Sequence, residues 1–317
     1  MTTEPPPLPG PANRKAGILL LGIGIGNIAG GILMAGLLAL VQIYRHDQIS
    51  NIVAPNLLLV PLVVGLVASW FWRDLNRTIG QLALDALWAT LVALAGGAIF
   101  LREGVICLLM CVPVLYVLIF AGMLLGRWWF RHDRSRLRIA MLPLVLVIAL
   151  ADSSRPSNRM TQVSDEILIR APVGKVWPHV LEFPNIPDKA DYWLFRIGLP
   201  YPTETTNGGN FVGADRRCIF SDGIVIKETV AEFLPNEKLT FDIVEQPTHP
   251  EVYGHITLHR GQFVLRDNGN NTTTLTGSSW YTLHVRPRWY FDLWARDMSR
   301  AVHLRVMNHV RRLAETN

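Results

Sequence analysis

The chain has 317 residues, a formal net charge of +5, 50% hydrophobic residues and only 17% charged residues. Soluble proteins carry about a quarter charged residues, so this composition argues against a wholly soluble protein and predicts a membrane portion. The positive charge does not indicate nucleic-acid binding, because the arginines lie beside apolar segments, as membrane topology signals do. The three cysteines exclude a disulfide framework in the water-soluble part.

The length exceeds the roughly 150 residues of a typical domain, which predicts two structural units. Residues 1–15 are rich in proline and are expected to form a disordered tail. Four segments then reach the roughly 20 apolar residues that a helix needs to cross a bilayer: 17–44, 52–72, 82–101 and 105–125. A fifth segment, 139–151, is shorter and contains Pro143. We expect an all-α transmembrane bundle of four or five helices over residues 16–152.

Positive charge predicts the orientation of these segments. Arg14 and Lys15 precede the first, Arg73 and Arg77 follow the second, and five arginines between 127 and 138 follow the fourth. Under the positive-inside rule these ends are cytoplasmic, which fits a bacterial inner-membrane protein with a cytoplasmic N-terminus. If segment 139–151 spans, the C-terminal part lies outside the cytoplasm; if it does not, that part is cytoplasmic. We favour spanning.

Three features inside the apolar half have a structural and a functional interpretation. Gly22, Gly26 and Gly30 share one helix face, which predicts close helix packing rather than nucleotide binding. Asp85 is the acid that lies well inside a span, and intramembrane acids are candidates for transport or proton transfer. It is also within reach of Arg77. Cys107 and Cys111 are four residues apart, but two thiols without a third ligand indicate packing rather than a metal site.

The composition changes near Asp152 to an ordinary mixture of charged, aromatic and turn-forming residues. Residues 153–163 are expected to be a linker and residues 164–317 a folded domain. Alternation and turn signals predict strands at 165–170, 216–221, 224–233, 239–246, 255–266 and 273–285. Two short helices follow the first strand, and the first of them opens at Pro172. Residues 288–315 carry apolar side chains along one face, which predicts a long helix packed on the sheet.

This order of elements over residues 165–317 resembles the START-like (SRPBCC) helix-grip superfamily, which includes polyketide cyclases, lipid-transfer domains, birch-pollen-type allergens and plant abscisic-acid receptors. Four segments carry the resemblance: ILIRAPVGKVWPHVLEF at 167–183, VGADRRCIFSDG at 212–223, IKETVAEFLPNEKLTFDIVE at 226–245 and TTTLTGSSWY at 272–281. The resemblance implies an α+β helix-grip domain, in which a curved antiparallel sheet grips the C-terminal helix and leaves an apolar cavity. The membrane half has no counterpart in the soluble members.

Strand alternation, with the inward parity that the resemblance implies, nominates the residues that line this cavity. The candidates are Arg216, Cys218, Phe220, Glu228, Phe241, Glu245, His255, His259, Phe263, Trp280, Trp294 and Met298. For the charged candidates the alternative is a structural ion pair or an outward orientation, because a strand bulge reverses the parity.

The remaining chemistry-bearing residues give no complete reactive arrangement. His255 and His259 lie about 13 Å apart on an extended strand, too far to share a metal ion, although either is a possible general base. Ser278 and Ser279 follow Gly277, but the strand-turn-helix elbow of serine hydrolases is absent. Cys218 is interpreted as a packing residue.

The leading hypothesis is a membrane-anchored START-like domain that binds a hydrophobic small molecule or lipid near the bilayer. One alternative is a cyclase or dehydratase that uses His255 or His259 as base and Arg216 to polarise a carbonyl. Another is a small transporter in which Asp85 matters and the soluble domain regulates. No cofactor, metal ion or nucleic-acid partner is expected, and the sequence does not predict the ligand or the oligomeric state.

Overall fold

The computed structural model describes residues 11–44, 54–101, 104–132, 159–188, 190–246 and 255–316. The chain divides into two compact units, residues 1–156 and 157–317. Segment 139–151, most of the expected linker and residues 1–10 lie outside the described residues.

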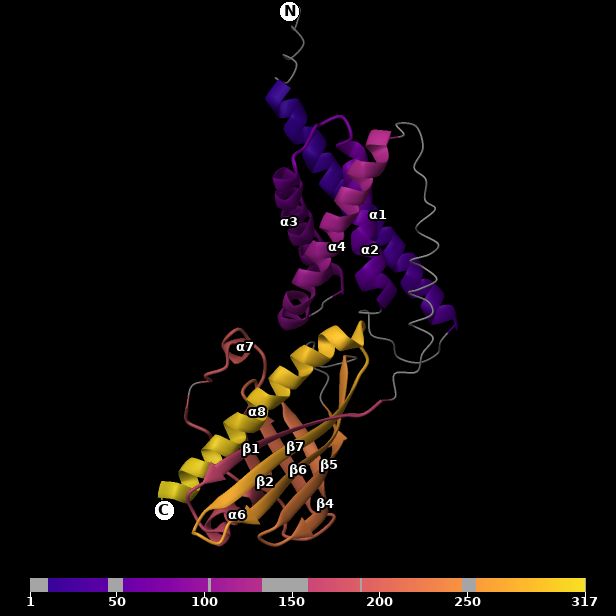
Figure 1. Ribbon diagram of the computed structural model, residues 1–317. Helices are drawn as coiled ribbons and strands as arrows, with labels where there is room; N and C mark the ends of the chain where they lie inside the picture. Colours follow the sequence, from indigo (N-terminus) through magenta and orange to yellow (C-terminus); the bar gives the residue numbers. More distant parts are fainter. Residues whose placement is uncertain are drawn as a thin grey trace, which may run out of the picture. The chain divides into compact units, whose positions relative to one another are not determined.

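The described part of the first unit is helical (Figure 1). It contains α1 (Pro11–Tyr44), α2 (Ala54–Phe71), α3 (Ile79–Gly96), a π-helical turn (Gly97–Leu101) and α4 (Val105–His132). Helix α1 begins at Pro11, inside the tail that was expected to be disordered.

Three stretches of these helices are long and apolar enough to cross a membrane: Arg14–Ala39, Ile79–Phe100 and Val105–Phe130. The sequence predicted four such stretches among these residues. Among the described residues, the apolar stretch of α2 is shorter, Leu57–Phe71.

Glycines set how closely the helices of this unit approach one another. A methyl group added at Gly22 would collide with Trp72, at Gly26 it would lie 2.8 Å from the Val64 carbonyl oxygen, and at Gly30 it would collide with Val64. The predicted packing of this glycine face is confirmed, and α2 is its partner. On the other side of α2, Gly65 and Gly122 leave no room for a side chain between α2 and α4. Small residues of this kind allow helix backbones to pack in contact.

The second unit contains a seven-stranded antiparallel sheet with the order β1-β7-β6-β5-β4-β3-β2. Its strands are β1 (Thr161–Ile169), β2 (Pro202–Asn207), β3 (Asp215–Phe220), β4 (Val225–Leu234), β5 (Lys238–Glu245), β6 (Ile256–Asp267) and β7 (Thr273–Leu283). Two short helices, α6 (Val173–Leu181) and α7 (Trp193–Arg196), separate β1 from β2. Consecutive strands from β2 to β7 are neighbours, so β1 and β2 form the two edges of the sheet.

Helix α8 (Arg288–Thr316) lies against this sheet (Figure 1) and contacts β1, β7, β2 and α6. Its buried residues Val306, Met307 and Val310 join a core with α6 and the inner face of the strands. Burial of one large apolar side chain contributes about 1.5–3 kcal/mol, so this helix face holds the domain together. The combination of a curved antiparallel sheet and a long C-terminal helix packed on it is the helix-grip architecture, and the predicted fold class is confirmed.

Strand β2 was not predicted from the sequence. Its residues, PTETTN, contain no apolar alternation, and β2 is an edge strand that pairs only with β3 in the sheet. Strand β1 also begins at Thr161, four residues before the predicted start, because its first half pairs in register with β7 up to Tyr281.

Candidate functional site

A cavity of about 120 Å³ lies between the inner face of the sheet and α8. Its wall includes the aromatic residues Phe183, Phe220, Phe241 and Phe263 and the aliphatic residues Ile226, Ile243, Val302 and Val306. Ligand sites in proteins are mostly apolar with a few well-placed polar groups.

An ion pair is buried in the cavity wall. Arg216 on β3 and Glu228 on β4 occupy directly paired positions, and their side chains are only 3% and 5% exposed. Arg216 Nη1 donates to Glu228 Oε2, and its Nε donates to the Leu181 carbonyl oxygen at 3.4 Å. The guanidinium carbon also lies 4.4 Å from the centre of the Phe241 ring. Burial raises the pKa of Glu228, and the neighbouring Arg216 partly offsets this increase.

Cys218 lies on the same face of β3 and also lines the cavity. Burial raises the pKa of its thiol to about 12, with a further contribution from the negative charge of Glu228. The thiol is therefore protonated at neutral pH. A protonated thiol is a weak nucleophile, which agrees with the interpretation of Cys218 as a packing residue.

A second polar group of the cavity wall consists of three side chains from three elements. Ser279 Oγ on β7 lies 2.8 Å from His303 Nε2 on α8, and His303 Nδ1 lies 2.9 Å from Asp165 Oδ2 on β1. Ser279 and His303 line the cavity. Sequence reasoning missed this group, because the three residues lie 24 and 138 positions apart and no local motif joins them.

Six of the twelve predicted lining residues of the second unit face the cavity: Arg216, Cys218, Phe220, Glu228, Phe241 and Phe263. They are the members that lie on regular stretches of β3, β4, β5 and β6. There the period-two alternation of a strand holds without interruption.

Glu245 was predicted to face inward and does not. It pairs with Lys227, whereas Ile243 pairs with Glu228, so one extra residue is inserted on β5 between these two pairs. This bulge turns Glu245 to the face of Lys227, where its exposed carboxylate lies 2.6 Å from Lys227 Nζ.

The prediction for His255 and His259 is wrong for a related reason. The register of β6 shifts between Leu258 and Arg260, so that Leu258, rather than His259, faces the cavity. His259 Nε2 instead lies 2.8 Å from Thr282 Oγ1. His255 is buried just before β6, and its carbonyl oxygen accepts from the backbone N–H of His284. Neither histidine is placed to act as a base in the cavity.

Trp280, Trp294 and Met298 also lie outside the cavity wall. Trp280 alternates with Ser279 and Tyr281, and Tyr281 faces α8, where its hydroxyl donates to Asp292 at 3.0 Å. Trp280 therefore points to the opposite face of the sheet. Trp294 packs edge-to-face on Trp193 of α7, with ring centres 6.4 Å apart. Met298 precedes Val302 by one helical turn and is half-buried beyond the cavity.

The second unit has another hollow, a groove of about 460 Å³ between residues 186–195 and α8. Its charged residues are largely engaged with one another. Arg312 pairs with Asp188, and the Tyr192 hydroxyl donates to Asp297 at 2.5 Å. Arg305 donates to the carbonyl oxygens of Asp188 and Pro202, both at 3.1 Å. These bonds fasten the loop to α8, so we place the ligand site in the apolar cavity rather than in this groove.

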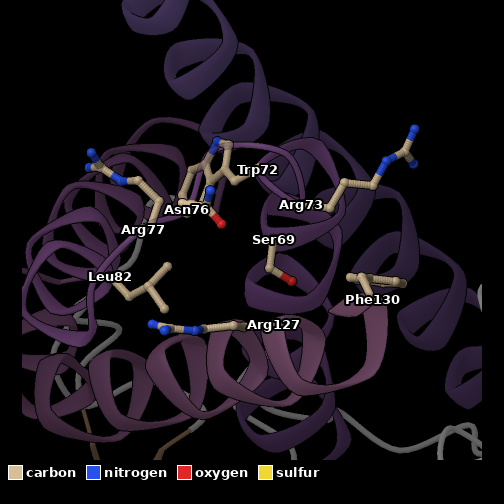
Figure 2. Close-up of a pocket in the computed structure, with 8 residues that line it drawn as sticks. All are labelled: Ser69, Trp72, Arg73, Asn76, Arg77, Leu82, Arg127 and Phe130. Carbon is tan, nitrogen blue, oxygen red and sulfur yellow. The ribbon is translucent and has the colours of Figure 1, made fainter. Parts of the chain in front are cut away.

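Figure 2 shows a small pocket within the first unit, lined by Ser69, Trp72, Arg73, Asn76, Arg77, Leu82, Arg127 and Phe130. Its volume of about 30 Å³ leaves room for water but not for a larger ligand. The side chains of Arg73 and Arg77 extend away from the pocket in opposite directions. They do not form a cationic cluster around it.

Asp85 on α3 is 6% exposed and is held by Arg77. Arg77 Nε donates to Oδ2 at 2.9 Å, and Arg77 Nη2 donates to Oδ1 at 2.7 Å. This two-point contact satisfies the buried acid within the helical unit. A transport role for Asp85 stays a prediction. Among the residues that the structure describes, no group of three His, Cys, Asp or Glu side chains is arranged to hold a metal ion.

No protein-family model matches the chain, and no curated protein matches it. Solved structures with a similar second unit include XoxI from Bacillus cereus (17% identity, 48% of this chain and 94% of that chain, TM-score 0.35). Norcoclaurine synthase from Thalictrum flavum matches at 11% identity over 50% of this chain and 96% of that chain, with a TM-score of 0.35. The ZhuI aromatase/cyclase from Streptomyces sp. R1128 matches at 16% identity over 50% of this chain and 94% of that chain, with a TM-score of 0.33. These scores are too low to support an inference, so the fold assignment rests on the strand order and on α8.

Proposed function

We propose that the second unit binds a small hydrophobic molecule, or one end of a lipid, in the cavity between the sheet and α8, and that the helical unit anchors it to a membrane. The observation that carries this proposal is an apolar cavity whose wall contains the buried pair Arg216 and Glu228. Burying two charges costs several kcal/mol per ion unless they are paired and hydrogen-bonded. A packed apolar interior would not need them, whereas a ligand with one polar end would be oriented by them.

The volume of the cavity limits the size of the ligand. Drug-sized ligands occupy sites of about 300–1,000 Å³, and this cavity measures about 120 Å³. The volume favours a ligand with one small ring or a short chain. A membrane lipid would place only one end inside, unless α8 moves away from the sheet.

The apolar surface of the helical unit supports its proposed role as a membrane anchor. Large side chains such as Leu20, Ile32 and Phe100 are 71%, 70% and 83% exposed. Apolar surface of this extent is unfavourable in water and favourable in lipid. A hydrophobic ligand partitions into the bilayer, and a tethered domain meets it there at a raised effective concentration.

The proposal is tested by native mass spectrometry of the full-length protein. The protein is purified in detergent, incubated with a total bacterial lipid extract and released from the micelle in the instrument. We expect a bound mass on the wild type, and we expect Cys218→Phe to lose it because the larger side chain fills the cavity.

Val225→Phe is the matched control, because Val225 alternates with the inward-facing Ile226 and is exposed on the other face of the sheet. It should retain the bound mass. A wild type that carries no bound mass, or a mass that Cys218→Phe retains in full, contradicts the proposal.

A further inference from the structure

Ser279, His303 and Asp165 form a continuous hydrogen-bonded chain at the cavity wall. The two links measure 2.8 Å from Ser279 Oγ to His303 Nε2 and 2.9 Å from His303 Nδ1 to Asp165 Oδ2. A nucleophile bonded to a base that is itself oriented by a third group is the general signature of an activated nucleophile. The arrangement is recognised by its geometry and roles, whatever the fold.

The fold fixes each member of this chain. Ser279 and Asp165 lie on the adjacent strands β7 and β1, where their neighbours in register are Val163 and Gly277. Gly277 lets α8 approach the sheet closely, since a methyl group there would lie 2.9 Å from Met307 Sδ. His303 precedes Met307 by one helical turn and therefore meets the same part of the sheet. Its side chain is only 7% exposed.

The hydrogen-bond partners of His303 determine which of its ring nitrogens carries the proton. A carboxylate only accepts hydrogen bonds, so His303 Nδ1 carries the proton toward Asp165. The free electron pair of Nε2 then accepts the hydroxyl proton of Ser279. Burial lowers the pKa of His303 below 6.5, against the opposing effect of Asp165, so the imidazole is neutral and able to accept a proton at pH 7. Arg300 Nε lies 3.5 Å from the other oxygen of Asp165 and supports its negative charge.

We propose that Ser279 is a nucleophile toward a small, apolar carboxylic ester bound in the cavity, with His303 as general base and Asp165 as the positioning residue. This inference rests on the proposed ligand site and adds a reaction to it. Ser279 and His303 line the cavity, whereas Asp165 lies behind His303. Ser279 therefore lies at the cavity end of the chain of three groups, where a bound molecule would meet it.

The reaction is balanced with water as the second reactant. Ser279 Oγ bonds to the carbonyl carbon as its proton passes to His303 Nε2. The bond from that carbon to the alcohol oxygen breaks, and the alcohol leaves with the proton. Water then attacks the acyl-serine, again through His303, and releases the acid and the free hydroxyl. The net change is ester plus water to acid plus alcohol. The cavity volume of about 120 Å³ restricts the acyl group to a short one.

The test uses diisopropyl fluorophosphate on the full-length protein in detergent, with peptide mass spectrometry to locate the modified residue. We expect modification at Ser279 in the wild type and none in Ser279→Ala. Loss of a general base costs about 10²–10⁴-fold in rate, so His303→Ala should react at least 100-fold more slowly. Ser164→Ala is the matched control: Ser164 adjoins Asp165 on β1, is exposed outside the cavity with its hydroxyl 2.8 Å from that of Ser278, and the variant should react at the wild-type rate.

A pH profile separates a positioning role of Asp165 from a merely structural one. The wild-type rate should rise with pH through the lowered pKa of His303 and reach a plateau near neutrality. Asp165 favours the charged imidazolium, so its replacement in Asp165→Asn should move this rise to lower pH and reduce the plateau at least 10-fold.

An unmodified Ser279 in the wild type would overturn the inference, whether or not the variants fold. Modification of a folded His303→Ala protein at the wild-type rate would also exclude an activated serine. Native mass spectrometry of the same sample separates the two proposals. A bound mass without modification by the reagent would support the ligand site and contradict the nucleophile. The absence of both a bound mass and modification would contradict both proposals.

Discussion

The side chains of Arg216 and Glu228 meet inside the cavity with almost no contact with solvent. Breaking such a pair leaves an uncompensated buried charge, which costs about 3–5 kcal/mol. We therefore expect Glu228→Gln to speed the amide hydrogen exchange of β3 and β4 by roughly 100-fold to several thousand-fold. Hydrogen-exchange mass spectrometry of the full-length protein measures this change.

The control is the exposed pair formed by Lys227, which adjoins Glu228 on β4, and Glu245 on the neighbouring strand β5. Exposed pairs contribute about 0–1 kcal/mol, so Glu245→Gln should leave exchange nearly unchanged. Equal effects of the two variants would show that the buried pair does not stabilise this part of the sheet.

At the residue scale, the sequence predicted the cavity wall where strands are regular. Alternation placed Arg216, Cys218 and Phe220 on one face, and that face lines the cavity. It failed for Glu245 and His259, because each lies at a one-residue bulge that reverses every side chain beyond it. A bulge depends on how two strands pair, and a single strand's sequence does not record its partner.

At the element scale, two glycines on the inner face of the sheet differ in how well they should tolerate an added methyl group. A methyl group at Gly261 would collide with the Phe241 ring, which is rigid and is held by Arg216. Overpacking of this kind costs about 1–3 kcal/mol. A methyl group at Gly277 would meet Met307 Sδ, and methionine is flexible enough to move aside.

We expect Gly261→Ala to destabilise β5 and β6 by about 1–3 kcal/mol and Gly277→Ala to have little effect. Hydrogen exchange of peptides from these strands measures both. Phe241→Leu, which makes room beside residue 261, should restore much of the loss in the double variant. If Gly277→Ala proves the more harmful change, the close approach of α8 is more rigid than Met307 suggests.

Helix α8 carries two buried histidines whose pKa values are lowered. Burial is the main cause for both; Asp165 opposes it at His303, and the positive charge of Arg312 adds to it at His309. Below pH 6.5 the unfolded chain binds more protons at these residues than the folded domain does. Stability is therefore fully present above pH 6.5 and is lost as pH falls toward the folded values, by up to about 1.4 kcal/mol per pH unit for each histidine.

The expected result is that the opening free energy of α8 falls between pH 7.5 and pH 5.5. Hydrogen exchange measures it after correction for the intrinsic effect of pH on exchange. His303→Gln, which removes one titrating group, should show a shallower dependence. A dependence of the opposite sign, with α8 more stable at pH 5.5, would contradict the lowered pKa values.

The long elements were more predictable than the short ones for a physical reason. Helix α8 repeats its apolar face over many turns, and residues 288–315 were predicted within a residue of the observed Arg288–Thr316. Strand β2 has six residues and little burial, and it gains its place from pairing with β3 rather than from its own pattern. The chain of Ser279, His303 and Asp165 was hidden for the same reason, since tertiary packing alone brings its members together.

At the scale of the whole molecule, the number of crossings decides which compartment the ligand domain faces. Helices α1, α3 and α4 contain stretches long enough to span, the apolar part of α2 is shorter, and segment 139–151 lies outside the described residues. With a cytoplasmic N-terminus, three or five crossings both place the C-terminus outside, so a C-terminal reporter alone does not distinguish them. A reporter in the segment after α4 distinguishes them, because this segment is cytoplasmic only if α2 crosses the membrane.

The distribution of positive charge indicates that α2 crosses the membrane. Arg127 and the arginines that follow it up to residue 138 favour a cytoplasmic end of α4, and Arg73 and Arg77 favour a cytoplasmic end of α2. We therefore expect alkaline phosphatase, which is active only outside the cytoplasm, to be inactive when fused after Ser135 and active when fused after Asn317. Lysines at Leu146 and Ile148 cost about 2.5–3.5 kcal/mol each at the centre of a span, so this double variant should silence the C-terminal fusion, whereas valines at both positions should not. Activity after Ser135 would mean that α2 does not cross, and a silent wild-type C-terminal fusion would place the cavity in the cytoplasm.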